Sequence, residues 1–582
     1  MRLSESVSAN ATSLYIIKSV KIDGKRTTKV VERLGNVEDI RKRLNGADPY
    51  KWARERVAEL NEQEKKGQLE ITARFLSGKT IDKNVDVIYK GGYLFLQSIY
   101  HQLGIHTIIK DIAEQKKFQY DLDSILSRLI YTRILYPSSK LSSYEESQSF
   151  IEKPRFELHQ IYRALEVLAE YSGHIQAAIY KNSINSLKRN TKILYYDVTN
   201  YFFDIDMADD LRKFGKSKQN QPNPIVQMGL FMDGDGLPLA FSIDPGNVNE
   251  QKMLRPLETQ IMKDFGLSKF IVVTDAGLSG IENRKFNSSG ERAYVTTQSL
   301  KKLQAHLIEW ALSPKGWSVL GSDKKNSKLI NLDDEDFDDS SDNKSIYFKE
   351  RWIVENQFEQ RLVVTYRPTF KVYQRHIRAE QFARAEKAVE ENKSLNKRNQ
   401  NDPKRFIKET NITKDGEIAD LKILTVDEAV VSKEERFDGF YGVCTNLFGK
   451  AEEIVQICKN RWQIEESFRI MKTDFKARPV YLRRDDRIKA HFLTCFLSLL
   501  VFKVLEKTLD NEYTTTQMIE QLKKIQFYRL PGEGYIPAYT RNDLTDKLHE
   551  TFGFRTDSEI TDEKKMKNIF KKTKKTQTLP TS

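Results

Sequence analysis

The order of strands and helices between residues 192 and 297 limits the fold more than any other feature of this sequence. Apolar runs of strand length, rich in β-branched and aromatic residues, alternate there with helical patterns. The expected strands lie at residues 192–203, 225–232, 237–243, 269–274 and 292–297, with helices at residues 250–265 and from about residue 279. Three strands, a helix, a strand, a helix and a strand predict an α/β domain with a mixed sheet.

Two acids occupy unusual positions in this layout. Asp197 stands in the middle of the apolar strand KILYYDVTNYFF, and Asp275 directly follows the strand KFIVVT. A carboxylate inside a buried strand is costly unless it is paired or binds a cation. For Asp275, a role as a turn or helix N-cap residue is an equal alternative. Asp197 is therefore the first candidate ligand of a cation.

A third acid, Glu465, belongs to the stretch CKNRWQIEESFRIMKTDF at residues 458–475. On a helix of about 100° per residue, Glu465 lies within roughly 40° of Arg461 and Lys472. Phe468 shares this face. The alternative is a solvated helix with an ordinary Arg–Glu pair at i, i+4.

Asp197, Asp275 and Glu465 are together the predicted catalytic residues and metal ligands. Three carboxylates from three elements can hold two Mg²⁺ ions about 4 Å apart, with Mn²⁺ as the expected substitute. Such a pair activates the attacking oxygen and stabilises the leaving oxygen of a phosphodiester. Arg461 and Lys472 would then contact DNA phosphates or offset charge in the transition state.

The composition favours a polyanionic partner and a reducing compartment. The 582 residues include 95 Lys and Arg against 82 Asp and Glu, a formal net charge of +13 that points to nucleic acid. The three cysteines form no CxxC pair, and the eight histidines have no metal-ligand spacing. Residues 1–13 are polar, and the strongest apolar run, at residues 492–505, is too short to span a bilayer. A cytoplasmic protein without a membrane partner is expected.

The regions before the α/β segment predict two smaller modules. Residues 14–22 and 25–34 read as strands of a hairpin turning at Asp23-Gly24, followed by a helix at residues 49–66. Helical periodicity from residue 91 to 187 suits either a DNA-binding bundle of helix-turn-helix type or ordinary helical packing.

The regions after the α/β segment no longer show the regular alternation of strands and helices. Strand patterns between residues 300 and 445, with a long charged helix at residues 377–396, indicate an inserted subdomain. Its acidic run at residues 333–342 is interpreted as a solvated loop. Seven lysines between Lys564 and Lys575 predict a flexible basic tail.

These motifs resemble those of DDE transposases of bacterial insertion sequences, in the branch with a strand-rich insertion between the second Asp and the Glu. The family signature is Tyr, two residues, Arg, three residues, Glu, six residues, Lys. Arg461, Glu465 and Lys472 match this spacing, whereas Cys458 replaces the Tyr. Further matching segments are VVERLG, RILYPSSKLSSYEES, YYDVTNYFF, GKSK, VVTDAGLSG and FDGFYGVCTN, so the resemblance covers nearly the whole chain.

The resemblance implies an α/β, RNase H-like catalytic core that a strand-rich insertion interrupts and a helical DNA-binding region precedes. The implied parts are a hairpin and helix module at residues 1–70, a helical region at 85–187, the core at 188–299 and 448–545, the insertion at 300–447 and the tail at 546–582. Lys216 and Lys218 of GKSK would add DNA contacts. Trp317 or Trp352 would stack on a flipped base, with a place in the core as the alternative for each.

The implied function is that of a DNA transposase. It would bind the terminal inverted repeats of its element, cleave the strands and join the 3′-hydroxyl ends to target DNA. A homodimer is expected in the synaptic complex, at the bacterial nucleoid. One alternative is an RNase H-like metal nuclease without strand transfer, and another is a catalytically inactive DNA-binding repressor of the element.

Overall fold

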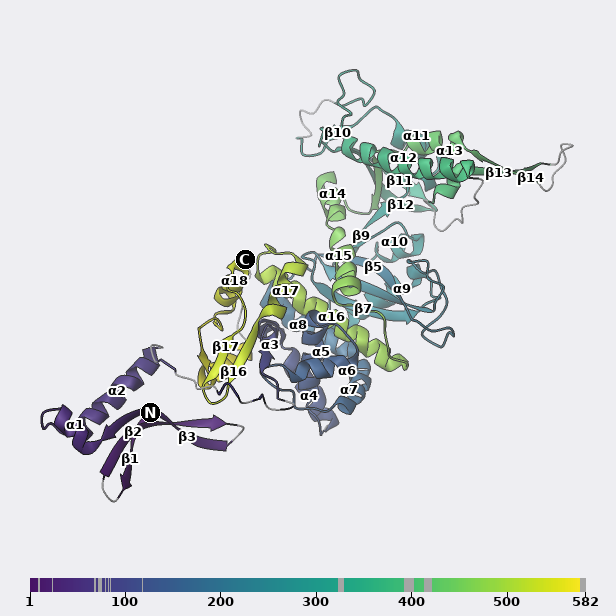
Figure 1. The fold of residues 1–582 in the computed structure, drawn as a ribbon. Helices are drawn as coiled ribbons and strands as arrows, with labels where there is room; N and C mark the ends of the chain where they lie inside the picture. The colour runs from purple at the N-terminus through teal and green to yellow at the C-terminus, as the bar shows by residue number, and fades with distance from the viewer. Residues whose placement is uncertain are drawn as a thin grey trace. The chain divides into compact units, whose positions relative to one another are not determined.

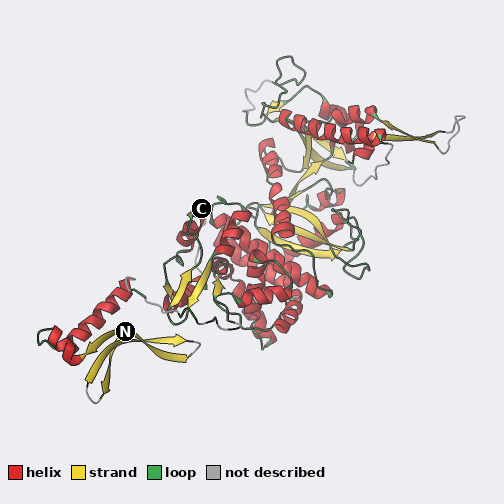
Figure 2. Cartoon of the chain, viewed as in Figure 1, coloured by secondary structure: helices red, strands yellow, loops and turns green. Residues whose placement is uncertain are grey.

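The computed structural model describes residues 1–8, 11–22, 25–66, 85–117, 119–322, 329–391, 402–412 and 421–575, with a few positions between 70 and 83. The chain divides into two compact units. The first comprises residues 1–102, 144–155 and 506–582, and the second comprises residues 103–143 and 156–505. Figure 1 labels many of the helices and strands of both units, and Figure 2 colours the chain by secondary structure.

A nine-stranded mixed sheet forms the centre of the second unit, in the order β10-β11-β12-β15-β9-β8-β5-β6-β7 (Figure 1). Its core strands are β5 (Ile193–Phe202), β6 (Ile225–Asp233), β7 (Pro238–Pro245), β8 (Ile271–Thr274) and β9 (Ala293–Gln298). The pairs β5–β6 and β6–β7 are antiparallel, whereas β8 runs parallel to both β5 and β9. Counted along the chain, the core strands lie in the order 3-2-1-4-5. This arrangement confirms the predicted RNase H-like core.

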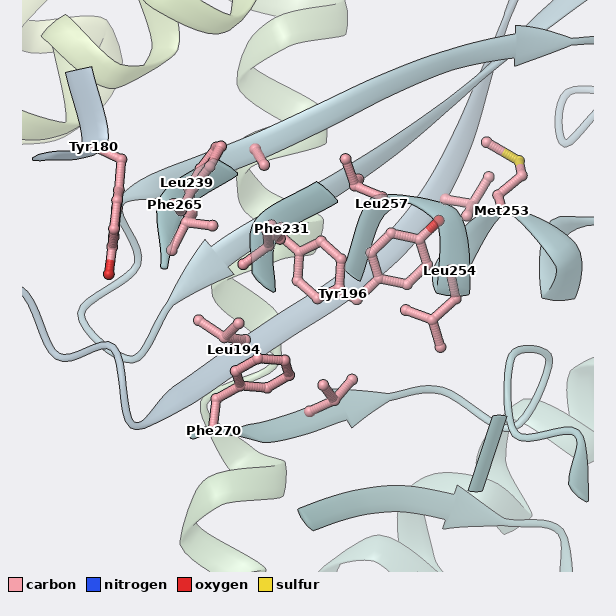
Figure 3. Packing of buried hydrophobic residues seen from close by; sticks show 14 of the residues in the cluster. Tyr180, Leu194, Tyr196, Phe231, Leu239, Met253, Leu254, Leu257, Phe265 and Phe270 are labelled. Carbon is pink, nitrogen blue, oxygen red and sulfur yellow. The ribbon is translucent and has the colours of Figure 1, made fainter. Parts of the chain in front are cut away.

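The strand β5 separates an apolar face from a face that carries Asp197. Leu194, Tyr196 and Val198 pack on the first face, in a cluster that includes side chains of α9 (Glu250–Gln260), as Figure 3 shows. Because side chains alternate along a strand, Asp197 and Tyr201 point to the opposite face.

Helix α16 (Asp485–Thr508) covers that opposite face. The ring of its Phe492 lies 4.8 Å from the ring of Tyr201, and its Phe496 lies 5.0 Å from Phe241 of β7. At 24 residues α16 is longer than the apolar run predicted from the sequence, and its length and composition would suit a membrane span. Most of its apolar window is nevertheless buried inside the protein, so α16 serves as a core helix.

The strands of the predicted insertion continue the core sheet. They are β10 (Ser318–Val319), β11 (Tyr347–Glu355), β12 (Phe358–Tyr366) and β15 (Phe440–Thr445), and β15 pairs antiparallel with β9. A separate two-stranded sheet contains β13 (Ile407–Ile412) and β14 (Leu421–Val426). The long helix α12 (Pro368–Glu390) begins earlier than predicted, because a proline suits the first position of a helix.

The helices predicted between residues 85 and 187 are divided between the two units. α3 (Tyr93–Gln102) belongs to the first unit. The second unit contains α4 (Ile105–Lys116), α5 (Leu122–Leu135), α7 (Leu158–Glu170) and α8 (Ser172–Leu187), while α6 (Lys140–Gln148) crosses the boundary. Nearly every residue of α5 is buried, so α5 is a packing helix of the core.

The first unit begins with three antiparallel strands. β2 (Ala11–Ile22) and β3 (Lys25–Asn36) correspond to the predicted hairpin, and β1 (Arg2–Ser8), which sequence reasoning missed, pairs with β2. The predicted turn at Asp23-Gly24 lies outside the described residues. Helices α1 (Val37–Arg43) and α2 (Pro49–Lys66) follow.

The predicted flexible tail is wrong for the residues up to 575. They form parts of α18 (Asp543–Phe552), β18 (Thr561–Asp562) and α19 (Glu563–Thr573), after α17 (Thr515–Lys524), β16 (Gln526–Leu530) and β17 (Gly534–Pro537). A four-stranded sheet has the order β18-β17-β16-β4, with β4 (Ile88–Lys90). Met566 and Ile569 of α19 are buried while most of its lysines are exposed. The tail is polar overall, but the two buried apolar residues of α19 stand three positions apart and give the helix one face to bury.

Candidate active site

Asp197 and Asp275 lie on neighbouring strands at matching positions. β5 and β8 are parallel, with Tyr195 opposite Val273. The same register carried two residues further brings Asp197 opposite Asp275, just beyond the end of β8. Side chains two residues apart share a face, and adjacent strands are about 4.8 Å apart. The sheet therefore places the two carboxylates next to each other.

The pKa of Asp197 reflects both its burial and the neighbouring carboxylate of Asp275. Burial raises the pKa of Asp197 to about 6; Lys218 opposes the shift and the carboxylate of Asp275 adds to it. The N–H of Val198 donates to Asp197 Oδ1 at 2.8 Å, and the N–H of Leu278 donates to Asp275 Oδ1 at 3.0 Å. Two adjacent, half-buried acids provide the oxygen donors that Mg²⁺ prefers. The two aspartates fit a divalent cation.

The stretch predicted as one helix at residues 458–475 has three parts. α14 (Ala451–Lys459) ends at Asn460, α15 (Trp462–Arg469) follows it, and the π-helical η4 (Ile470–Asp474) completes the segment. Single-face reasoning at 100° per residue does not apply across such a change of helix type, which is frequent at functional sites. The prediction of one continuous helix is therefore wrong, although the segment does approach Asp197.

The η4 turn covers the face of β5 that carries Asp197. Lys472 Nζ donates to Thr199 Oγ1, and the hydroxyl of Tyr201 donates to Met471 Sδ at 4.0 Å. Burial lowers the pKa of Lys472 to about 8, and Arg478 and Lys218 lower it further while Asp197 opposes them. The alternation in DVTNY could have indicated that Thr199 and Tyr201 share the face of Asp197.

Glu465 does not join the two aspartates in this structure. Arg461 Nη2 and Glu465 Oε1 form an ion pair at 2.5 Å, and the Glu465 side chain is 55% exposed. Among the described residues, no group of three His, Cys, Asp or Glu side chains could hold a metal ion. The Arg–Glu pair given as the alternative from sequence is thus present, and the charge of Arg461 also lowers the pKa of Asp197.

The GKSK loop is attached to the core strand beside Asp197. Asn200 Nδ2 donates to the carbonyl of Lys216 at 3.1 Å, and the N–H of Lys218 donates to Asn200 Oδ1 at 3.2 Å. Lys218 Nζ donates to the carbonyl of Val198 and lies 3.7 Å from Glu250 Oε1. Both lysines are exposed, but Lys218 belongs to the site through its side-chain contacts, whereas Lys216 contacts the strand only through its carbonyl.

Cys458 lies beside Tyr441, a neighbour that the sequence did not predict. Burial raises the pKa of its thiol to about 12, which Arg461 opposes. The thiol lines a cavity of about 300 Å³ together with Tyr441 and Lys459. Burial also raises the pKa of Tyr441 to about 12. Cys458 and Asp275 raise the pKa of this hydroxyl further, whereas Arg461 lowers it. Tyr441 and Cys458 thus both lie near the predicted catalytic residues.

The two candidate stacking tryptophans have different surroundings. Trp317 is fully buried and its Nε1 donates to the carbonyl of Ser313 at 2.9 Å, so it is a core residue and the stacking prediction is wrong for it. Trp352 is 38% exposed, and its ring lies 4.9 Å from that of Phe448, which is 86% exposed. Trp462, beside Arg461, is also exposed.

The strand order, with one aspartate on β5 and the other directly after β8, defines the class of RNase H-like proteins. Residues 207–501, slightly more than half of the chain, match the family model of the transposase DDE domain. The chain belongs to this family of DDE transposases. No curated protein matches it.

The solved structures that match the chain include two transposase complexes. A piggyBac transposase in a synaptic complex with hairpin DNA has 8% sequence identity and a TM-score of 0.34, over 84% of each chain. A Mos1 transposase in a paired-end complex with the left transposon end has 12% identity and a TM-score of 0.13, over 39% of this chain and 62% of the other.

Proposed function

We propose that this DDE transposase binds the terminal inverted repeats of its element, cleaves the DNA and joins the freed 3′-hydroxyl ends to target DNA. The observation that carries the proposal is the register of β5 and β8, which pairs Asp197 with Asp275 on the core sheet. Lys472, Lys218 and Arg461 approach Asp197 from three other parts of the second unit. Carboxylates surrounded by cations suit a phosphodiester substrate.

Asp197 and Asp275 would hold divalent metal, Mg²⁺ in the first instance and Mn²⁺ as its substitute, with Glu465 as the third ligand. Two such ions supply activation of an attacking oxygen and stabilisation of a leaving oxygen. For Glu465 to take part, its carboxylate must leave Arg461, which frees the guanidinium for a DNA phosphate. The ion pair between them would therefore open when Glu465 binds metal.

The cations of the site would bind and orient the DNA strand. Lys472 and Lys218 lie next to Asp197, so a phosphate beside that acid is within their reach, and exposed Lys216 extends the contact along the strand. The adjacent exposed rings of Trp352 and Phe448 form a platform on which an unpaired base would stack. This keeps Trp352 as a stacking residue and adds Phe448 to it.

The predicted division of the chain completes the proposal. The module at residues 1–70 and helices of the 85–187 region would contact the inverted repeats, and two copies would pair the element ends in a homodimeric synaptic complex. Such an enzyme would act on DNA in the bacterial cytoplasm, at the nucleoid.

A strand-transfer assay tests this function. Asp197→Asn, Asp275→Asn and Glu465→Gln should each reduce Mg²⁺-dependent cleavage and joining of element ends to plasmid by at least 10³-fold (order of magnitude), because each removes a metal ligand. Binding of the same duplex should stay within about threefold of wild type, since each change removes negative charge from the site. Asp334→Asn in the exposed acidic run is the matched control and should retain activity.

The outcomes separate the alternatives. Cleavage without joining of a 3′-hydroxyl oligonucleotide would indicate a metal nuclease, and repeat binding without any cleavage would indicate a repressor. Full activity in any one of the three variants would remove that residue from the proposed site.

A further inference from the structure

A second group of cations lies inside the second unit, where the loop after η4 meets the start of α6. Arg133 of α5 is 3% exposed and Lys140, the first residue of α6, is 6% exposed. They line a cavity of about 70 Å³ with His491 of α16, which we call the Lys140 cavity. The proposed DNA cleavage site makes no use of this group.

The two cations are balanced by no carboxylate among the described residues. Arg133 donates to the carbonyls of Phe475 and Lys476 at 3.2 Å and of Ser138 at 2.9 Å, while its Nε has no acceptor. No described residue accepts a hydrogen bond from Lys140 or pairs with it. A buried, unpaired ammonium costs several kcal/mol in general, so a protein that keeps one usually has a use for it.

The polar part of the cavity wall lies at the start of α6, and the rest of the wall includes apolar residues such as Pro479 and Leu482. Ser138, Ser139 and the first residues of α6 form that polar part, and Ser139 Oγ accepts from the N–H of Ser142 at 3.1 Å, which fixes the start of the nine-residue helix. The first N–H groups of a helix have no partners within it and favour an anion. His491 Nε2 lies 2.9 Å from the carbonyl of Ala477.

The charges acting on Lys140 agree with this geometry. Burial lowers the pKa of Lys140 to about 7, Arg133 lowers it further, and only the thiol of Cys495 opposes them. An anion in the cavity would reverse this shift. The rim is open, because Leu141 and Tyr481 are exposed. The volume of the cavity, about 70 Å³, is several times the ~10–15 Å³ that one water molecule needs.

We propose that the Lys140 cavity binds a phosphate group, held by the Lys140 ammonium and the first N–H groups of α6 above the Arg133 guanidinium. Its expected source is a backbone phosphate of bound DNA, which rests on the proposed function. Free inorganic phosphate has the same chemistry and is the other source. Arg133 also holds the carbonyls that follow η4, so an occupied cavity would fix the segment that presents Lys472.

The first test uses the full wild-type chain and inorganic phosphate. Lysine acylation at pH 7.5, mapped by mass spectrometry, should be slowed at least threefold at Lys140 by phosphate compared with chloride at equal ionic strength. Lys269, which is exposed and pairs with Glu291 at 2.8 Å, is the control and should react equally in both salts. Equal rates at Lys140 in both salts would overturn the proposal.

A variant provides the second readout. Phosphate should raise the Tm of wild type and of Lys269→Met, and this rise should be absent in Lys140→Met. In chloride, Lys140→Met should melt no lower than wild type, because it removes an unpaired buried charge. A lower Tm in chloride together with an unchanged phosphate effect would assign Lys140 a structural role and overturn the site.

DNA binding distinguishes the two sources. If the phosphate comes from DNA, a duplex should protect Lys140 from acylation, and Lys140→Met should reduce the salt dependence of duplex binding by about one unit. Protection by inorganic phosphate alone would support the site with free phosphate as its ligand. A wild-type chain that binds no DNA would refute the proposed function, while the acylation test with phosphate would still decide the site.

Discussion

At the scale of single residues, the site depends on which charges share one face of β5. Asp197 is half-buried and has an acid as its neighbour, and both features raise its pKa, to about 6. Lys218 and Lys472 partly balance it, and both are fixed by contacts to β5, at the carbonyl of Val198 and at Thr199. The strand therefore orders both cations before any ligand arrives, which lowers the entropy cost of binding phosphate.

Lys472→Met tests this role for a cation that the strand holds in place. The variant keeps the length of the side chain and loses its charge, so it should weaken DNA binding for all sequences and reduce the salt slope by about one unit. Binding titrations at four salt concentrations provide the measurement. Lys269 precedes β8, whereas Asp275 follows it, so Lys269 lies at the other end of the strand. Lys269→Met should therefore leave the salt slope unchanged. Equal slopes in wild type and Lys472→Met would show that Lys472 does not contact phosphate.

At the scale of elements, periodicity predicted the core strands closely, because their apolar runs are bounded by turns. It also located Asp197 and Asp275 on neighbouring strands. It failed for residues 458–475, where the backbone changes from α-helix to π-helix at Ile470. That change follows from tertiary packing on β5, which no local pattern reports. The burial of Trp317 is also a consequence of packing, so the sequence left its two alternatives open. The ion pair of Glu465 with Arg461 is instead a local i, i+4 contact, which the sequence offered as an alternative.

The contact between α9 and α10 (Ile281–Phe286) yields a prediction about pH. Burial raises the pKa of Glu258 to about 8, and Glu258 Oε1 accepts from Asn287 Nδ2 at 2.9 Å. An acid whose pKa is higher in the folded state binds its proton there while the unfolded chain has lost it. Stability from this group should therefore fall as the pH rises from about 4.5 to 8, by up to ~1.4 kcal/mol per pH unit.

Glu258→Gln removes this titration and keeps an acceptor for Asn287. The difference in free energy of unfolding between the variant and wild type, measured with urea at pH 5, 6.5 and 8, should grow with pH in favour of the variant. Thr259→Ser, one residue further along α9 and exposed, should follow wild type at every pH. Parallel curves for Glu258→Gln and wild type would mean that Glu258 is ionised in the folded protein.

At the scale of the whole molecule, the chain closes its first unit with three distant segments, residues 1–102, 144–155 and 506–582. Helix α19 connects them. Gln97 Nε2 donates to Thr573 Oγ1 at 2.9 Å, and Lys574 Nζ pairs with Glu152 Oε1 at 2.5 Å. The lysines predicted to lie on a flexible tail are therefore presented by a folded helix, which fixes where this part of the positive charge lies.

Truncation after Asp562 tests whether α19 stabilises this unit. It removes the buried side chains of Met566 and Ile569, each worth about 1.5–3 kcal/mol on full burial, and uncovers the surface of α3 that α19 contacts. The Tm of the first unit should fall by several degrees, about 4–8 °C for each kcal/mol in a domain of 60–100 residues and less in a larger one. Truncation after Lys575 keeps every one of these contacts and should melt like the full chain. If both truncated proteins melt and resist protease alike, α19 adds charge to the surface without stabilising the unit, and its lysines would then act as the mobile basic segment that composition alone predicts.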